Sequence, residues 1–218
     1  MDTGYCIDID DTLIAFAPDY QGRHSTASLL DILKLAAVRL AGLSADEAAR
    51  IIEQVKIEVN WWSWSDFLAP LSLDPDRFWE FAYETEKAYL KPAEPRLAEH
   101  IRRLKVGGTR VYITSNNPQD GICHKLRLAG VPADLFDDIY GATKLRAMKW
   151  ETQFWQQVVE RSGISPQRLI TVGDDFRDDW QIPAQIGLGK CFLVNRDGRN
   201  DGKRDDGVQL IKTFEEIA

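Results

Sequence analysis

The segment GYCIDIDDTLIAF, residues 4–16, places three acids at the end of a short apolar run. We predict a buried strand over residues 4–9, with Asp8, Asp10 and Asp11 near its carboxyl end. Because alternate residues of a strand share a face, Asp8 and Asp10 are expected to point the same way. Neighbouring carboxylates repel one another and are costly to desolvate, whereas a divalent cation would neutralise them. The segment therefore predicts a strand that ends in a metal site.

Two alternatives for these acids are weaker. A calcium-binding loop is suggested by the alternate positions of Asp8, Asp10 and Thr12. An EF-hand, however, needs glycine where Leu13 stands and glutamate where Asp19 stands, so we reject it. A solvated turn with helix-capping acids does not explain why an apolar strand leads directly into the acids.

Composition narrows the class of protein. The 218 residues contain 27 Lys and Arg against 34 Asp and Glu, a formal net charge of −7, without a basic stripe. We therefore expect no nucleic acid polymer as a partner. We also expect no membrane partner, because no apolar run approaches a membrane span. Three scattered cysteines fit a reduced compartment, so the expected location is cytoplasmic; nothing indicates the oligomeric state.

Strand and helix patterns alternate through most of the chain, which predicts an α/β fold with a Rossmann-like parallel sheet. The predicted strands are 4–9, 109–117, 137–142, 168–175 and 190–195. The predicted helices between them are 95–105, 119–130, 151–163 and approximately 178–186. Open parallel sheets bind ligands at the carboxyl ends of their strands, where the acids of the first strand lie.

One long segment interrupts this alternation, because residues 16–91 show helical patterns and no strand signal. Ser44 and Glu47 form a capping-box pattern, and Asp74 followed by Pro75 is typical of a helix start. The segment therefore predicts an inserted helical subdomain. The expected division is a catalytic core of residues 1–15 and 92–218 and an all-helical cap of residues 16–91.

Four motifs in order resemble those of the haloacid dehalogenase superfamily of hydrolases. DIDDTL (8–13) resembles the DxDx(T/V) first motif, and VYITSN (111–116) resembles the second. Lys149 resembles the third, and LITVGDDFRDD (169–179) resembles the GDxxxxD of the fourth. In this superfamily an insertion between the first two motifs is a type C1 cap, which covers the site and selects the substrate.

The resemblance implies roles for the acids. Asp8 would be the nucleophile that accepts a phosphoryl group as an aspartyl-phosphate. Mg²⁺ would be held by the Asp8 carboxylate, the backbone carbonyl of Asp10 and Asp174, with Asp179 orienting the metal shell. Asp10 would also protonate the leaving alcohol and then deprotonate the attacking water. Two further acids, Asp175 and Asp178, are interpreted as caps and solvating groups of the following helix.

Phosphate-binding groups follow from the same resemblance. Lys149 would supply positive charge to Asp8 and to the phosphoryl oxygens, and backbone N–H groups near Asn116 would donate to those oxygens. Either Thr114 or Ser115 could supply the hydroxyl of the second motif, since they lie on opposite faces of a strand. We choose Ser115 because Asn116 follows it directly.

These residues predict a Mg²⁺-dependent phosphomonoester hydrolase that acts on a small phosphorylated metabolite. Dehalogenation is the nearest alternative, but the dehalogenases of the superfamily lack the acid that Asp10 supplies here. A phosphomutase, or a silent binding or regulatory protein with the same fold, stays open.

Other conspicuous residues are expected to be structural. Three histidines without ligand spacing are predicted to lie at the surface: His24, His100 and His124. The charged, glycine-rich segment 195–207 is interpreted as a solvated loop. We also predict that at least one of Trp61, Trp62 and Trp64 lies near the cleft between cap and core.

Overall fold

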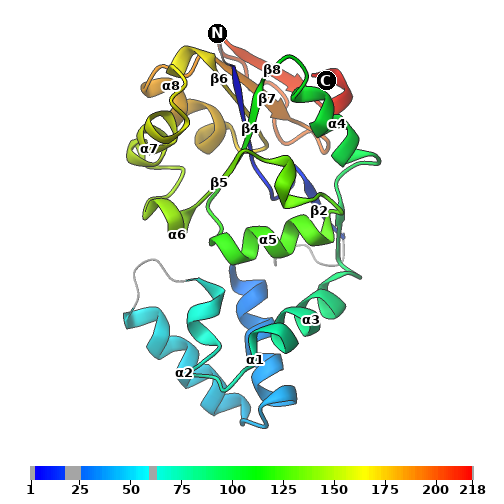
Figure 1. The fold of residues 1–218 in the computed structure, drawn as a ribbon, viewed down its shortest axis with the longest axis vertical. Helices are drawn as coiled ribbons and strands as arrows, with labels where there is room; N and C mark the ends of the chain where they lie inside the picture. The colour runs from blue at the N-terminus through cyan, green and yellow to red at the C-terminus, as the bar shows by residue number, and fades with distance from the viewer. Residues whose placement is uncertain (1–2, 18–25, 59–62, 218) are drawn as a thin grey trace.

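A computed structural model describes residues 3–17, 26–58 and 63–217. Its centre is a six-stranded sheet with the strand order β5-β4-β1-β6-β7-β8, in which every neighbouring pair is parallel (Figure 1). The predicted fold class is therefore confirmed. The strands are β1 (Gly4–Ile7), β4 (Arg110–Ser115), β5 (Asp138–Gly141), β6 (Leu169–Gly173), β7 (Lys190–Val194) and β8 (Val208–Ile211).

Helices cover both faces of this sheet, because its strands alternate apolar side chains between two cores. Ile7 of β1 packs in the cluster that α4 and α5 complete, whereas Cys6 packs in the cluster that holds Phe154 and Trp155 of α7. Figure 1 shows α7 and α8 on one side of the sheet, α4 on the other, and α5 between the sheet and the cap. These helices are α4 (Leu97–Leu104), α5 (Gln119–Leu128), α6 (Ala142–Leu145), α7 (Thr152–Ser162) and α8 (Ile182–Gln185).

The cap is a helical unit with its own apolar core, which includes Leu33, Ile52, Phe67 and Phe78. It comprises α1 (Thr26–Leu40), α2 (Ala45–Glu58), the 3-10 turn η2 (Trp64–Phe67) and α3 (Pro75–Glu86). The start signals act as expected: the backbone N–H of Glu47 donates to Ser44 Oγ (3.2 Å), and that of Arg77 donates to Asp74 Oδ1 (3.0 Å). Among the described residues, no helix is long and apolar enough to cross a membrane.

Two short strands join cap and core, and the sequence prediction missed them. β2 (Ile14–Phe16) pairs antiparallel with β3 (Leu90–Pro92), so both connections of the cap run through one two-stranded ribbon. The expectation of helices alone between residues 16 and 91 was wrong at these ends, because three-residue strands carry too little periodicity to detect.

The remaining differences concern one missed strand, the type of one helix and the end of the first strand. β8 was not predicted, because VQLI follows a glycine- and charge-rich loop and is only four residues long. The helix expected over about 178–186 is one π-helical turn, η5 (Arg177–Gln181), followed by α8. The first strand ends at Ile7, since the chain then turns sharply and the N–H groups of Leu13 and Ile14 both donate to Ile9 O (2.9 Å each).

Candidate active site

The carboxyl ends of three adjacent strands meet at one cavity. Asp8 follows β1, Ser115 ends β4 and Asp174 follows β6. The cavity measures about 300 Å³, and its lining contains most of the predicted site residues together with further polar groups. These are Asp8, Asp10, Asp11, Ser115, Asn116, Asn117, Lys149, Asp174, Asp175 and Asp178. The sheet topology thus gathers motifs that lie far apart in the sequence.

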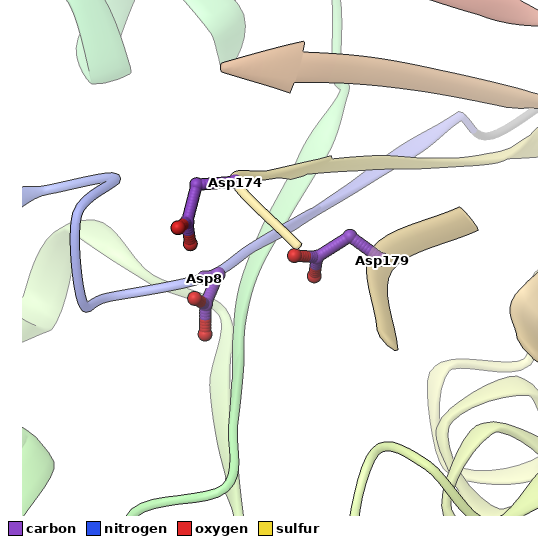
Figure 2. A group of neighbouring side chains, drawn as sticks. All are labelled: Asp8, Asp174 and Asp179. Carbon is purple, nitrogen blue, oxygen red and sulfur yellow. The ribbon is translucent and has the colours of Figure 1, made fainter. Parts of the chain in front are cut away.

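Three of the carboxyl groups are close enough to bind one metal ion. One oxygen from each of Asp8, Asp174 and Asp179 lies within 4.8 Å of the other two (Figure 2). Asp179 is fully buried beneath the cavity, and its Oδ2 accepts a hydrogen bond from the Asp175 N–H (3.0 Å). Carboxylate oxygens are the ligands that Mg²⁺ prefers, so the donor set fits a divalent cation.

Gly173 makes this arrangement possible. A Cβ atom at this position would lie 2.1 Å from Asp179 Cγ, far inside van der Waals contact. The buried carboxylate therefore rests against the backbone at the end of β6. This contact gives a physical reason for the glycine of the GDxxxxD pattern.

Lys149 is the cation at the base of the cavity. Its ammonium lies 3.0 Å from Asp8 Oδ1 and 2.6 Å from Asp179 Oδ1, and the residue is only 2% exposed. Its backbone is also fixed: the N–H donates to Asn116 Oδ1 (2.7 Å), and the carbonyl accepts from Trp155 Nε1 (2.9 Å). The second motif and helix α7 thus hold the lysine in place.

Burial and mutual repulsion shift the titration of these groups. Burial raises the pKa of Asp8 to about 7, against the lowering effect of Lys149. Burial and the charges of Asp8 and Asp179 raise the pKa of Asp174 to about 9, and burial also raises the pKa of Asp179. Burial lowers the pKa of Lys149, but the carboxylates of Asp179 and Asp8 outweigh it and keep the ammonium charged. The cluster therefore favours additional positive charge.

Ser115 and Thr114 take opposite sides of β4. Ser115 lines the cavity, and its Oγ accepts hydrogen bonds from the backbone N–H (3.1 Å) and Nδ2 (2.9 Å) of Asn117. Thr114 is fully buried and does not line the cavity. Asn116 also lines the cavity, and its side-chain amide already makes two hydrogen bonds. Its Oδ1 accepts from the Lys149 N–H, and its Nδ2 donates to Asp178 Oδ2 (3.0 Å). Its backbone N–H remains a candidate phosphate donor.

Asp10 has partners that the sequence did not indicate. Its carboxylate accepts from Lys125 Nζ at both oxygens (2.6 and 2.8 Å) and from Asn117 Nδ2 (2.6 Å). The only signal for Asn117 was the doubled asparagine after Ser115. Lys125 carried no signal, because it is one of several basic residues in a helix.

The segment 195–207 is not the simple solvated loop that we expected. Arg199 Nη1 donates to Asp174 Oδ2 (2.9 Å) and Asp11 Oδ2 (3.2 Å), and the Arg196 guanidinium donates to the backbone carbonyls of Asp11 (2.8 Å) and Thr12 (3.1 Å). The loop also walls a second cavity of about 440 Å³, which shares Asp11 and Asp174 with the first. Residues on this loop therefore hold the first motif in shape.

Two histidine predictions were wrong. His100 and His124 are buried, and each pairs with a buried glutamate: His100 Nδ1 with Glu94 (2.9 Å) and His124 Nε2 with Glu86 (2.6 Å). A sequence pattern assigns polar residues to the surface. It cannot show that a distant part of the chain covers them. His24 lies outside the described residues.

The tryptophan prediction is only partly tested, because Trp61 and Trp62 lie outside the described residues. Trp64 is 1% exposed within the cap core and does not line either active-site cavity. Its indole packs against Gly121 of α5, where an added Cβ would lie 2.5 Å from Nε1. Trp64 thus contributes to the joint between cap and core.

The chain thus combines a Rossmann-like parallel sheet, an inserted helical unit and an acid-lined cavity at the carboxyl edge of the sheet. The chain matches the haloacid dehalogenase-like hydrolase family over residues 3–187, and it belongs to that family. A search of curated proteins found no match.

Solved structures of two kinds of enzyme share the fold. The chain is similar to a HAD phosphatase from Thermococcus onnurineus, with 24% identity, 100% of this chain and 96% of that chain covered, and a TM-score of 0.64. It is similar to a 2-haloacid dehalogenase from Pseudomonas syringae pv. Tomato DC3000, with 20% identity, the same coverage and a TM-score of 0.64. CbbY from Rhodobacter sphaeroides, solved in complex with phosphate, shares 16% identity over 100% and 97% of the two chains, with a TM-score of 0.57. These likenesses establish the fold, and the chemistry has to come from the site.

Proposed function

We propose that the protein is a Mg²⁺-dependent phosphomonoester hydrolase that forms an aspartyl-phosphate on Asp8. The observation that carries the proposal is the group of Asp8, Asp174 and Asp179, with Lys149 as its buried counter-charge. When ionised, the three carboxylates outnumber the two cations that contact them among the described residues, the Lys149 ammonium and the Arg199 guanidinium at Asp174, and a divalent cation would balance the remaining negative charge. Adjoining cavities of about 300 and 440 Å³ suit a small phosphorylated substrate.

The metal would be held by the Asp8 and Asp174 carboxylates and the backbone carbonyl of Asp10. Asp179 would orient this set, since one of its oxygens lies within 4.8 Å of an oxygen of each of the two carboxylates and it is fixed by Lys149 and the Asp175 N–H. When bound, Mg²⁺ supplies positive charge that offsets the repulsion between a carboxylate and a phosphate dianion.

The first half of the reaction transfers the phosphoryl group to Asp8. A carboxylate oxygen of Asp8 forms a bond to phosphorus while the ester P–O bond breaks, and Asp10 gives its proton to the departing alcohol. Lys149 and the Ser115 hydroxyl stabilise the phosphoryl oxygens. In the second half, Asp10 takes a proton from water, the water oxygen bonds to phosphorus, and the bond to Asp8 breaks. Inorganic phosphate and the original carboxylate result.

Asp10 is the residue that favours this chemistry over dehalogenation. It follows the nucleophile by two positions and lines the same cavity as Asp8 and Ser115. An alkyl halide releases a halide ion that needs no proton, whereas an alcohol leaving group does. A proton donor beside the nucleophile therefore serves ester hydrolysis better.

A phosphatase assay with a panel of phosphate monoesters, with Mg²⁺ and with excess chelator, tests the proposal. We expect phosphate release only with Mg²⁺, and its loss in Asp8→Asn, because an amide is a poor nucleophile. Asp134→Asn, at an exposed acid of the core, is the matched control and should retain activity. Release of halide from 2-chloropropionate without metal, with no ester hydrolysed, would refute the proposal.

A further inference from the structure

Lys125 makes a close two-oxygen contact with the acid proposed to transfer protons. Its ammonium lies 2.6 Å from Asp10 Oδ1 and 2.8 Å from Asp10 Oδ2, and it also donates to Asn117 Oδ1 (3.0 Å). Asn117 Nδ2 donates in turn to Asp10 Oδ2 (2.6 Å). The three side chains form a closed ring of hydrogen bonds at the edge of the cavity.

This ring differs from an ordinary surface ion pair in geometry and in shielding. The Lys125 and Asp10 side chains are 15% and 27% exposed, and Asp10 has both oxygens engaged. Exposed pairs gain little because two long side chains must be ordered for one contact. Here Asn117 is already fixed by Ser115, so Lys125 joins a network that is largely ordered.

The ring also separates Asp10 from the metal-binding acids. Asp8, Asp174 and Asp179 form the close group of carboxylates, and Asp10 is not a member of it. The Asp10 carboxylate is instead held by Lys125 of α5 and by Asn117, so these two side chains set its orientation.

Helix α5, which carries Lys125, is also the helix on which the cap docks. Asp120 accepts from the Ser65 N–H (2.7 Å) and hydroxyl (2.8 Å), and His124 bonds to Glu86 of α3 (2.6 Å). Arg127 adds a contact with Glu80 (2.9 Å). The position of Lys125 is therefore fixed by the core on one side of the helix and by the cap on another.

We propose that Lys125 is a positioning residue that holds the Asp10 carboxylate where it transfers a proton to the leaving group. This inference rests on the proposed phosphatase function and deepens it. A mispositioned acid fails mainly when the leaving group needs a proton, so the loss in Lys125→Met must depend on leaving-group basicity. A merely structural role would lower the rates of all esters equally.

The test compares kcat/KM for phenyl phosphate and p-nitrophenyl phosphate, two esters of similar size whose phenols differ in basicity. We expect Lys125→Met to lower kcat/KM for phenyl phosphate about 10-fold more than for p-nitrophenyl phosphate. This difference is a part of the roughly 10²–10⁴-fold rate enhancement that general acid catalysis supplies. Lys125→Arg, which keeps the cation, should restore much of the difference. Arg127→Met, on the same helix but paired with Glu80, is the control and should show no such difference.

A double variant sharpens the comparison. In an Asp10→Asn background, Lys125→Met should cause little additional loss, because the residue that it positions no longer transfers a proton. Equal losses on both esters, or additive losses in the double variant, would overturn the inference while the wild type still hydrolysed both. If the wild type hydrolysed neither ester nor any other monoester, the proposed function would fail and take the inference with it. Should Lys125→Met not fold, Lys125→Gln supplies the same comparison.

Discussion

Replacing Lys149 with methionine should destabilise the metal-free protein strongly at alkaline pH. The ammonium lies 3.0 Å from Asp8 and 2.6 Å from Asp179, and all three residues are buried. Methionine fills a similar volume but leaves the carboxylates without their cation. Removing one partner of a buried ion pair costs about 3–5 kcal/mol, and this is the loss that we expect near pH 8.5 in chelator.

The loss should shrink as the pH falls, and the sign follows from the raised pKa values. The pKa values of Asp8 and Asp174, about 7 and 9, lie above the ordinary value for aspartate, so the folded protein binds protons more tightly than the unfolded chain. The stability that these groups contribute is fully present below the ordinary aspartate pKa of about 4, falls as the pH rises, and is lost above the folded pKa values of about 7 and 9. Without Lys149 these pKa values rise further, so protonation at pH 5 should remove most of the penalty.

Urea unfolding in excess chelator at pH 5 and pH 8.5 measures both effects as free energies of unfolding. Lys144→Met is the matched control, because Lys144 pairs with Asp138 at the surface, where a pair contributes about 0–1 kcal/mol. A loss below about 1 kcal/mol at pH 8.5, or the same loss at both pH values, would refute the view that Lys149 neutralises a buried cluster.

Three further predictions concern the fourth motif, the metal and the cap. Gly173→Ala should destabilise the protein by about 1–3 kcal/mol and reduce turnover, because its Cβ would displace the Asp179 carboxylate; unchanged unfolding and kcat would contradict this. Mg²⁺ should raise the melting temperature more at pH 8 than at pH 6, because below the Asp174 pKa of about 9 protons compete with the metal for this carboxylate. An equal or larger rise at pH 6, measured by calorimetry, would exclude such competition. Glu86→Gln should weaken the buried hydrogen bond with His124 and so loosen the contact of the cap with α5. Hydrogen exchange would then show faster amide exchange in α3 and α5, and unchanged exchange in both helices would mean that other contacts dock the cap.

The parts of the site that could be predicted from sequence are those whose partners lie within one motif. Asp8 and Asp10 are two residues apart, and Gly173, Asp174 and Asp179 fall within seven positions. The sharp turn after β1 and the single turn after β6 hold such neighbours beside one cavity, although Asp8 and Asp10 lie beyond the end of β1 and strand alternation does not orient them. The sheet order then brings the motifs together, because parallel strands present their carboxyl ends at one edge. Local geometry and one topological rule were sufficient there.

The missed features are pairs between distant segments. Lys125 and Asp10 are 115 positions apart, Arg199 and Asp174 are 25 apart, and each pair joins an acid of a motif to a base in a helix or loop without a distinctive pattern. Coulomb attraction specifies that a buried or half-buried acid needs a partner, but it does not specify which of the chain's 27 basic residues supplies it. That choice is made by the packing of the segments that carry the charges.

Helix α5 shows why periodicity alone gives the wrong result at such positions. Ile122 and Leu126 enter the main core, as an amphipathic pattern predicts, and the polar residues around them are then assigned to solvent. In the folded chain the cap covers one of those polar faces and buries His124, while the active site occupies another and engages Lys125. A helix between two subdomains and a cavity has three buried sides, and only one of them needs to be apolar. Polar residues on the other two are retained where each finds a hydrogen-bond partner, and on α5 Glu86 and Asp10 supply those partners.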